Sequence, residues 1–284
     1  MKFNGDMMDN LRLTVLVVTY NHKEYIEQCL NSILMQKTKF DFIVKIVDDC
    51  STDGTSDIVK KYKGKYPDKI NVVIRGQNLG VLSSVYPELC DISTPYLYII
   101  DGDDYILDEN KFQIQIDVLD KHPECTICTH KVKFVDLKQN STYSLPNKPE
   151  KDSIFDIYQA PFCQTSSHMC RNIIDFANED KQIVWDVFRF YKLLSLGKLY
   201  YINKTMSVYN RTGLGMDSAR DDEKALFDHM KMMYALDVFF KFKYTKLFRK
   251  SYLPELALRV NMKKFNWKIP KWCRVIQKLL CKYL

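Results

Sequence analysis

Residues 11–55 have the sequence LRLTVLVVTYNHKEYIEQCLNSILMQKTKFDFIVKIVDDCSTDGT, and this stretch decides the fold class. Its two apolar segments, residues 13–19 and 42–47, are short and rich in β-branched side chains, which is typical of strands buried on both faces. Between them, apolar residues recur at helical spacing from Ile26 onward, and Asn21 is placed to cap this helix. The order strand, helix, strand predicts a parallel pair joined by a crossover helix.

The same alternation continues to about residue 101. Turn-forming residues 52–55 introduce a helix, strands are expected at 70–74 and 96–100, and a helix is expected at 81–90. The sequence therefore predicts an α/β, Rossmann-like fold with a mostly parallel, twisted sheet flanked by helices.

The second half of the chain has a mixed pattern and ends in a helical extension. We expect a strand at 126–134, a polar loop at 140–152, a helix at 186–196 that Gly197 ends, short strands at 199–202 and 206–209, and mostly helix from 221 onward, broken near Pro254 and Pro270. The predicted organisation is a catalytic domain at 1–220, with halves at 11–120 and 121–220, and a basic helical extension at 221–284.

The nine cysteines are odd in number and irregularly spaced, and residues 1–10 lack the features of a secretory signal. We therefore expect reduced thiols and a cytoplasmic protein. Cys125 and Cys128 form a CxxC pair, but no second pair with zinc-ligand spacing follows, so a metal role for them is not expected. No apolar run approaches the roughly 18 residues that a membrane-spanning helix needs.

Basic residues are concentrated at the carboxyl end: residues 241–284 contain thirteen Lys or Arg and one acid, Glu255, whereas the rest of the chain is net acidic. Within residues 270–284 (PKWCRVIQKLLCKYL), apolar and aromatic side chains form one helical stripe with lysines and arginine beside it. This pattern is typical of a helix bound peripherally to an anionic membrane face, here the inner face of the cell membrane. A helix packed on the core would show it equally, and no nucleic-acid motif is present.

Polar clusters follow three of the expected strands: Thr19-Tyr20-Asn21, Asp48-Asp49 and Asp101-Gly102-Asp103-Asp104. Ligands of such sheets bind outside the carboxyl ends of the strands, so the three clusters are expected to converge on one crevice.

Each cluster suits part of a nucleotide-diphosphate site. The carboxylates of 101–104 suit Mg2+ or Mn2+, which neutralises a departing diphosphate, and Gly102 would leave room for the ligand. Asp48 and Asp49 could accept hydrogen bonds from a base or ribose, and Tyr20 could stack on the base. The simpler alternatives are a solvated turn at 101–104, caps of the following helix at 48–49, and an ordinary strand-to-helix turn at Tyr20.

Four motifs in this order, VVTYNHKEYIEQCLNSILMQ, IVDDCSTDGT, NLG at 78–80 and IIDGDDY, closely resemble the family-2 glycosyltransferases with the GT-A fold. The resemblance is strong over 11–120 and traceable to about 218. It implies a sugar-nucleotide site formed by Thr19, Tyr20, Asn21, Asp48, Asp49, Asn78, Gly80, Asp101, Gly102 and Asp103. It also implies that Asp103 and Asp104 hold Mn2+ or Mg2+.

The resemblance further implies an acidic catalytic base eleven residues before a Gly-Lys pair. Gly197-Lys198 places it at Asp186, in preference to Glu179-Asp180 upstream; alternatively, Asp186 only opens a helix. On the acceptor side it implies Ser167 and His168, although a lone histidine is more often structural. A family histidine that follows Tyr-Arg is replaced here by Thr212, and Arg211 could substitute for it at the diphosphate.

The implied activity is that of a metal-dependent, inverting glycosyltransferase of the hexosyltransferase type, which moves a sugar from a nucleotide, expected to be a UDP-sugar, to a saccharide hydroxyl. A lipid-linked acceptor in bacterial surface glycan synthesis would suit the basic tail. The alternatives are a retaining or nucleotidyl transferase, an inactive binding-only relative, and a signalling receiver domain. The receiver reading leaves residues 101–104 and Asp186 unexplained.

Overall fold

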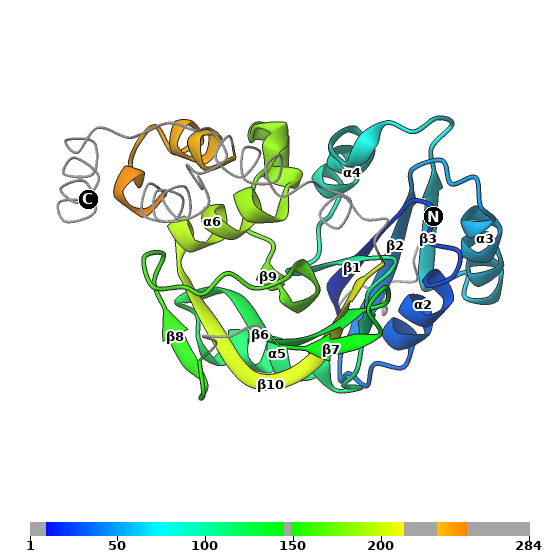
Figure 1. Cartoon of the computed structure of the whole chain (residues 1–284), viewed down its shortest axis with the longest axis horizontal. Coiled ribbons are helices and arrows are strands. Elements are labelled where there is room, and N and C mark those ends of the chain that lie inside the picture. Colours follow the sequence, from blue (N-terminus) through cyan, green and yellow to red (C-terminus); the bar gives the residue numbers. More distant parts are fainter. Residues whose placement is uncertain (1–9, 145–148, 213–231, 249–284) are drawn as a thin grey trace, which may run out of the picture. The chain divides into compact units, whose positions relative to one another are not determined.

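The structure is a computed structural model that describes residues 10–144, 149–212 and 232–248 (Figure 1). The chain forms two compact units, Met1–Gly213 and Leu214–Leu284. The sequence-based division at residue 220 stays a prediction.

Four parallel strands form the amino-terminal half of the sheet of the first unit. They are β1 (Leu11–Thr19), β2 (Asp41–Asp48), β3 (Ile70–Ile74) and β4 (Tyr96–Asp101), in the spatial order β3-β2-β1-β4. The strand order reverses at β1, which lies between β2 and β4, and ligands of such sheets bind at this reversal, outside the carboxyl ends of the strands. The predicted α/β fold with a mostly parallel sheet is confirmed, and all four strands lie within a few residues of their predicted positions.

Three helices bury their apolar stripes against one face of this sheet. They are α2 (Ile26–Leu34), α3 (Thr55–Lys65) and α5 (Lys111–Lys121), and their buried residues share one hydrophobic cluster with the strands. Side chains alternate between the faces of a strand, so Val15 and Val17 enter this cluster, whereas Leu16 is buried outside it, toward the other face.

Helices α4 (Gly80–Cys90) and α6 (Asp186–Leu196) form a separate layer. Both pack against the short 3-10 helix η3 (Lys181–Val184), and α4 also contacts η2 (Phe176–Asn178). Figure 1 shows α6 across the sheet from α5. The helix prediction for 81–90 is confirmed despite Pro87 inside α4.

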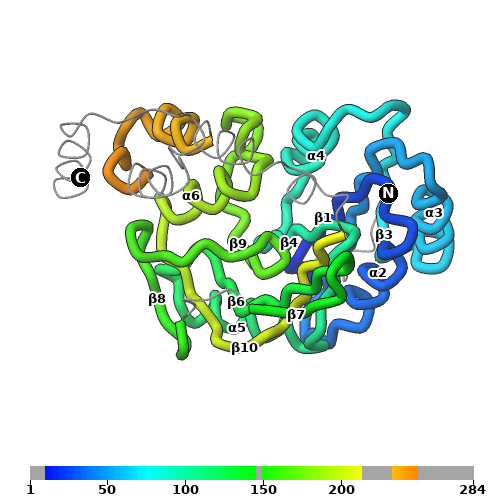
Figure 2. Tube along the Cα trace, viewed as in Figure 1, coloured from blue at the N-terminus to red at the C-terminus, as the bar shows by residue number. Residues whose placement is uncertain are grey.

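The other half of the sheet is built around two long parallel strands, β6 (Cys125–Asp136) and β10 (Lys198–Arg211), which run side by side in Figure 2. Short β9 (Met169–Arg171) joins β6 to β4 through antiparallel pairing on both sides. Three more short strands pair antiparallel at the margins: β5 (Tyr105–Ile106) and β8 (Ser153–Phe155) with β10, and β7 (Ser141–Tyr143) with β6.

Two local predictions from the sequence were wrong. The expected short strands at 199–202 and 206–209 are one strand, because the polar residues between them are absorbed by irregularities in register between Ile202 and Ser207. Asn21 does not cap α2, which begins at Ile26. Asn21 instead adopts φ 55°, and its side chain accepts a hydrogen bond from Thr52 N at 2.8 Å.

Gly197 ends α6, as predicted. Its φ of −175° is ordinary extended backbone, so a left-handed cap is not the reason for glycine here. A Cβ at this position would lie 2.5 Å from Thr126 Cγ2 and 2.8 Å from the Glu124 carbonyl oxygen. The position therefore needs glycine because β6 passes too close for any side chain.

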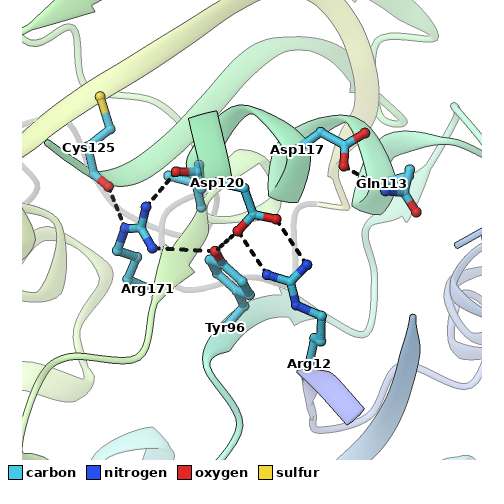
Figure 3. A network of polar contacts seen from close by, with 8 residues as sticks. Arg12, Tyr96, Gln113, Asp117, Asp120, Cys125 and Arg171 are labelled. Atoms are coloured by element: carbon cyan, nitrogen blue, oxygen red, sulfur yellow. Dashed lines mark hydrogen bonds and ion pairs between the residues drawn. The ribbon is translucent and has the colours of Figure 1, made fainter. Parts of the chain in front are cut away.

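A polar network holds the amino-terminal edge of the sheet (Figure 3). Arg12 at the start of β1 forms a two-pronged ion pair with Asp120 of α5, at 2.9 and 2.8 Å, and Tyr96 donates its hydroxyl to the same carboxylate at 2.5 Å. Arg171 Nε donates to the Cys125 carbonyl at 2.8 Å. The network thus joins β1, β4, β9 and α5 at the edge opposite to the polar strand ends.

Cys125 and Cys128 are both buried and unpaired in β6, as the structural interpretation of the CxxC pair predicts. In the second unit the described residues are helical at 232–239 and 245–248. Residues 270–284, the predicted amphipathic helix, lie outside the described residues. In the part of the chain that the structure describes, no helix is long and apolar enough to span a membrane.

Candidate functional site

The carboxyl ends of β1, β2 and β4 meet at one edge, as predicted. In the sheet register Thr19 pairs with Asp48, and Val18 pairs with Asp101. The backbone continues this pairing past the strand ends, because Asp49 N donates to Thr19 O at 3.0 Å and Gly102 N donates to Val18 O at 2.8 Å. The three polar clusters therefore lie side by side.

The turn after β4 concentrates carboxylates in a poorly hydrated place. Burial, followed by repulsion from Asp103, raises the pKa of Asp101 to about 7. Burial likewise raises the pKa of Asp103 to about 6, and burial together with its two acidic neighbours raises the pKa of Asp104 well above its usual range. Burial is thus the main reason that these carboxyl groups hold their protons more tightly than exposed ones.

The imidazole of His22 lies close to this turn, and no motif in the sequence singles it out. Its Nε2 lies 3.8 Å from Asp103 Oδ2, and its buried Nδ1 has no hydrogen-bond partner within the described ranges. Burial lowers the pKa of His22, although the charge of Asp101 opposes this. His22 follows Asn21 directly, so only the conformation of that turn reveals that the ring faces the carboxylates.

Gly102 has a different role from the one expected. A Cβ there would lie 2.8 Å from Thr19 Oγ1, 2.9 Å from His22 Nδ1 and 3.0 Å from Ile26 Cδ1. The missing side chain therefore makes room for the end of β1 and the start of α2, and the explanation based on space for a ligand is corrected.

Asp104 is bonded mainly to the protein itself. It is 2% exposed, its Oδ1 accepts a hydrogen bond from Asn210 N at 3.0 Å, and its carboxylate also bonds the Ser166 side chain. Asn210 Nδ2 in turn donates to the Asp103 carbonyl at 2.7 Å. Asn210 and Ser166 thus anchor the acidic turn, and the role of Asp104 as a metal ligand stays a prediction.

The two aspartates after β2 support the surrounding loops. The carboxylate of Asp48 accepts from Ser51 N at 3.0 Å, from Ser51 Oγ at 2.6 Å and from Ser56 Oγ in the first turn of α3. Asp48 thus holds the turn between β2 and α3 without capping α3, whose N-cap is Gly54, and a contact between Asp48 and a nucleotide stays a prediction.

Asp49 holds the loop that resembles the family motif NLG. Its two carboxylate oxygens accept from Leu79 N and Gly80 N, each at 2.9 Å. Asn78 Oδ1 accepts from the same Gly80 N at 3.1 Å, and Gly80 has φ 74°, which glycine adopts without strain. The structure thus brings Asp49, Asn78 and Gly80 together, while their contacts with a nucleotide stay predictions.

Tyr20 follows β1 at this edge, and 42% of its surface is exposed. The chain next to it is fixed, because Asn21 N donates to Ser51 Oγ at 2.9 Å. An exposed aromatic ring on a fixed turn is suited to stacking on a base.

Asp186 begins α6 and lies near the acidic turn. Its charge contributes to raising the pKa of Asp101, and Arg189 interacts electrostatically with both carboxylates. Asp186 Oδ2 accepts from Thr165 Oγ1 at 2.9 Å, and Oδ1 accepts from Val187 N at 2.8 Å. The structure therefore brings the predicted base and the predicted donor site together.

The two acids upstream of Asp186 are engaged elsewhere. Glu179 forms an ion pair with Lys192, and Asp180 accepts from Gln182 N at 2.9 Å as the cap of η3. These contacts give both acids structural roles, which supports the choice of Asp186.

The predicted acceptor-side residues are mostly buried. His168 is 2% exposed, its Nε2 lies 2.8 Å from the Cys163 carbonyl, and its ring stacks on Phe190. Ser167 is fully buried and donates to Gln164 O at 2.7 Å. These contacts favour structural roles for both residues, so a direct acceptor contact stays a prediction that this conformation does not favour.

Arg211 is the last residue of β10 and lies close to Tyr143 and Asp136. Its Nη1 lies 3.4 Å from the Tyr143 hydroxyl and 3.8 Å from Asp136 Oδ2. Its neighbour Asn210, which points its amide at the acidic turn, is thus the β10 residue that contacts the candidate site in this structure. A diphosphate contact by Arg211 stays a prediction.

The residues present suit a hard divalent cation. Within the described ranges no three His, Cys, Asp or Glu side chains form a ready-made metal cluster. However, Asp101 and Asp103 offer carboxylate oxygens in one turn, and burial raises the pKa of both groups. Carboxylate oxygens are ligands that Mg2+ and Mn2+ prefer when diphosphate oxygens complete the coordination.

Comparisons with known sequences agree with this geometry. The sequence model described as "Glycosyl transferase family 2" matches residues 14–176. The uncharacterized protein Rv1520 of Mycobacterium tuberculosis is 29% identical over 220 residues, which cover 76% of this chain and 64% of that protein. The poly(ribitol-phosphate) β-N-acetylglucosaminyltransferase TarS of Staphylococcus aureus is 36% identical over 97 residues, which are 34% of this chain and 17% of TarS. Each match thus covers less than two thirds of the relative's own length, for Rv1520 as for TarS.

Solved structures share the fold at low sequence identity. The S. aureus TarS 1–349 complex with UDP-GlcNAc has a TM-score of 0.60 at 18% identity and covers 89% of this chain and 77% of that one. The mannosyltransferase PcManGT from Pyrobaculum calidifontis, in complex with GDP-Man and Mn2+, has a TM-score of 0.55 at 15% identity, with coverages of 96% and 81%. These likenesses confirm the GT-A type of fold.

Proposed function

Because this chain belongs to glycosyl transferase family 2, we propose that it is an inverting glycosyltransferase that moves a sugar from a UDP-sugar to a saccharide hydroxyl. One observation carries the proposal: Asp186, at the start of α6, accepts a hydrogen bond from Thr165, and the adjacent Ser166 bonds Asp104 of the acidic turn after β4. A single base beside a diphosphate site is the arrangement that a direct displacement requires.

The proposed donor site uses the shared edge of β1, β2 and β4. Tyr20 stacks on the base, and the loop held by Asp49 borders the nucleotide together with Asn78 and Gly80. Support for uridine comes from TarS, whose structures contain UDP and UDP-GlcNAc. The complex of PcManGT with GDP-Man makes guanosine the comparison to test.

The proposed metal is Mn2+ or Mg2+, held by Asp103 with Asp101 and Asp104 of the same turn. When bound, the cation supplies positive charge that stabilises the diphosphate leaving group. The Mn2+ in the PcManGT complex supports this assignment. For its part the protein provides the carboxylates and anchors them through Asn210 and Ser166.

In the proposed reaction Asp186 acts as general base. Its carboxylate takes the proton of the acceptor hydroxyl as that oxygen attacks the anomeric carbon, the bond from carbon to the diphosphate oxygen breaks, and UDP leaves. A single displacement inverts the anomeric configuration. The contacts from Thr165 and Val187 leave acceptor capacity on both oxygens, because each carboxylate oxygen accepts two hydrogen bonds.

The base assignment is tested with Asp186→Asn and the matched control Asp180→Asn. The substrate is the UDP-sugar that raises the melting temperature of the protein most. We expect Asp186→Asn to lower its turnover by about 100-fold or more, because a positioned base contributes roughly 10²–10⁴-fold. Binding of UDP should not change, and Asp180→Asn should turn over normally, since Asp180 caps η3. Turnover is measured as released UDP, and the product anomer by NMR.

Two outcomes would contradict the proposal. Near-normal turnover of Asp186→Asn would show that Asp186 is not the general base. Retention of the anomeric configuration in the product would indicate a retaining transferase. If the unmodified protein binds UDP-sugars and turns none over, an inactive binding relative is the better description; the replacement of the family histidine by Thr212 makes this the second candidate.

We further propose a lipid-linked saccharide acceptor of bacterial surface glycan synthesis, reached by peripheral membrane contact of residues 270–284. The basic, amphipathic sequence of this segment supports the contact, and the match to a poly(ribitol-phosphate) glycosyltransferase, TarS, supports a polymeric acceptor. Flotation of the full chain with phosphatidylglycerol vesicles tests the contact. We expect co-flotation that Lys271→Glu/Lys278→Glu weakens; no flotation with these vesicles would contradict it.

A further inference from the structure

We infer that the 3-10 helix η1 (Thr165–Ser167) sets the position of the catalytic base relative to the donor site, with Thr165 as the positioning residue of Asp186. The inference rests on the proposed function, because it assigns a role to a neighbour of the proposed base. It concerns two side chains, Thr165 and Ser166, that contact opposite parts of the site.

Thr165 restrains the carboxylate from outside its own helix. Its Oγ1 donates to Asp186 Oδ2 at 2.9 Å, whereas the other oxygen is held by Val187 N within α6 at 2.8 Å. With one hydrogen bond on each oxygen, rotation of the carboxylate breaks at least one of them.

Ser166, the next residue, binds the other part of the site. Its side chain bonds the carboxylate of Asp104, and Ser207 Oγ of β10 donates to Ser166 Oγ at 3.3 Å. Adjacent residues of one short helix therefore hold the base and the acidic turn. The separation between these two groups is fixed by a single peptide unit and its two side chains.

The core holds η1 in place. The Tyr98 hydroxyl donates to Ser166 O at 2.8 Å, and Gln115 Nε2 of α5 donates to Ser167 O at 2.9 Å. Ser166, Ser167, Tyr98 and Gln115 are all fully buried. A buried polar group that loses its partner is costly, so these bonds resist displacement of η1.

Positioning of this kind affects the rate more than binding. A shift of about 1 Å in a reacting group can cost roughly 100-fold in rate, whereas sugar-nucleotide binding depends on the strand ends and the acidic turn. Loss of the Thr165 hydroxyl should therefore lower kcat and leave the KM of the sugar nucleotide nearly unchanged.

The experiment compares Thr165→Val, which keeps the shape and removes the hydroxyl, with Thr165→Ser, which keeps the hydroxyl. Thr142→Val provides the same chemical change at an exposed position of β7. The readout is UDP released by hydrolysis of UDP-glucose, UDP-galactose, UDP-N-acetylglucosamine and UDP-N-acetylgalactosamine, with water in place of the acceptor. Each variant is also made in the Asp186→Asn background.

We expect Thr165→Val to lower kcat about 10-fold to 100-fold, and Thr165→Ser and Thr142→Val to stay within about 3-fold of the unmodified protein. In the Asp186→Asn background Thr165→Val should have no further effect, because the group that it positions is gone.

Equal kcat of Thr165→Val and the unmodified protein would overturn the inference. So would a full additional loss in the Asp186→Asn background, which would show that Thr165 acts through general stability. Both results leave the proposed function intact, whereas it fails on its own if Asp186→Asn is as active as the unmodified chain.

Discussion

At the residue scale, Cys50 occupies a backbone conformation that favours glycine. Its φ is 67°, at the turn where β2 leads into α3. Left-handed backbone costs a residue with a Cβ about 1–2 kcal/mol, and the entropy of an unfolded glycine offsets part of this. Cys50→Gly should therefore raise the free energy of unfolding by about 1 kcal/mol in urea denaturation.

Asn21→Gly is the comparison for Cys50→Gly, because Asn21 has a similar φ of 55°. Asparagine tolerates this region, and its side chain accepts from Thr52 N, so no gain is expected. An equal gain for both variants, or none for Cys50→Gly, would show that backbone strain at Cys50 is not significant.

Gly102 allows the acidic turn to pack against β1 and α2. Gly102→Ala should lower the free energy of unfolding by about 1–3 kcal/mol, because the added methyl would meet Thr19, His22 and Ile26 at 3.0 Å or less. It should also weaken UDP binding, since the carboxylates must move. Denaturation and calorimetry measure the two effects.

The control for Gly102→Ala is Gly64→Ala in α3, where nothing lies within 4 Å of the added methyl. That substitution should stabilise by about 0.5–1 kcal/mol through helix propensity. If Gly102→Ala were also stabilising, the close packing of the turn would be disproved.

Single residues show how far the site could be predicted from sequence. Asp101, Asp103 and Asp186 were identifiable because strand ends and motif spacing place them in the chain. The contacts of His22, Asn210 and Thr165 depend on turns and strand register that only the folded chain defines. For the same reason the sequence could not show that Asp48 binds groups of its own turn and that Asp49 binds backbone amides of the loop after β3.

At the scale of elements, the amino-terminal strands were predictable because short, continuous runs of β-branched residues are typical of buried strands. Strand β10 was predicted as two pieces, because its polar residues Asn203 and Lys204 resemble a turn, whereas the sheet accommodates them as irregularities in register. Pairing with β6 along most of its length outweighs the local preference.

Helix α5 buries a lysine that should make stability depend on pH. Lys111 is fully buried, its Nζ lies 3.5 Å from the centre of the Tyr98 ring, and within the described ranges it has no hydrogen-bond acceptor. Burial lowers the pKa of Lys111 well below its usual range. At pH values between the pKa of Lys111 in the folded chain and its pKa of about 10.4 in the unfolded chain, only the unfolded chain binds the proton. The destabilisation of the fold by this lysine therefore decreases as the pH rises.

Lys111→Met should therefore raise the melting temperature at pH 7, with a gain that shrinks as the pH approaches 10. Lys121→Met, at the exposed end of the same helix, is the control and should show no such trend. A gain independent of pH would show that packing, rather than the charge of Lys111, limits stability.

At the scale of the whole molecule, the two edges of the sheet in the first unit carry different kinds of polar groups. The network of Arg12, Tyr96, Asp120 and Arg171 closes the amino-terminal edge of the sheet (Figure 3). The carboxyl ends of the same strands hold buried carboxylates with raised pKa values, which cost stability. Carboxyl groups that are buried at one edge despite this cost are expected of a site that binds a charged ligand.

The most direct test of the account is the thermal shift that UDP causes, with and without Mn2+, in the unmodified chain and in Asp103→Asn. UDP at about 100 times its Kd should stabilise the folded protein by about 2.7 kcal/mol when Mn2+ is present. The shift should exceed that of GDP and should be lost in Asp103→Asn but kept in Asp57→Asn, an exposed acid of α3. No shift with either nucleotide, or an undiminished shift in Asp103→Asn, would contradict the assignment of the acidic turn as the sugar-nucleotide site.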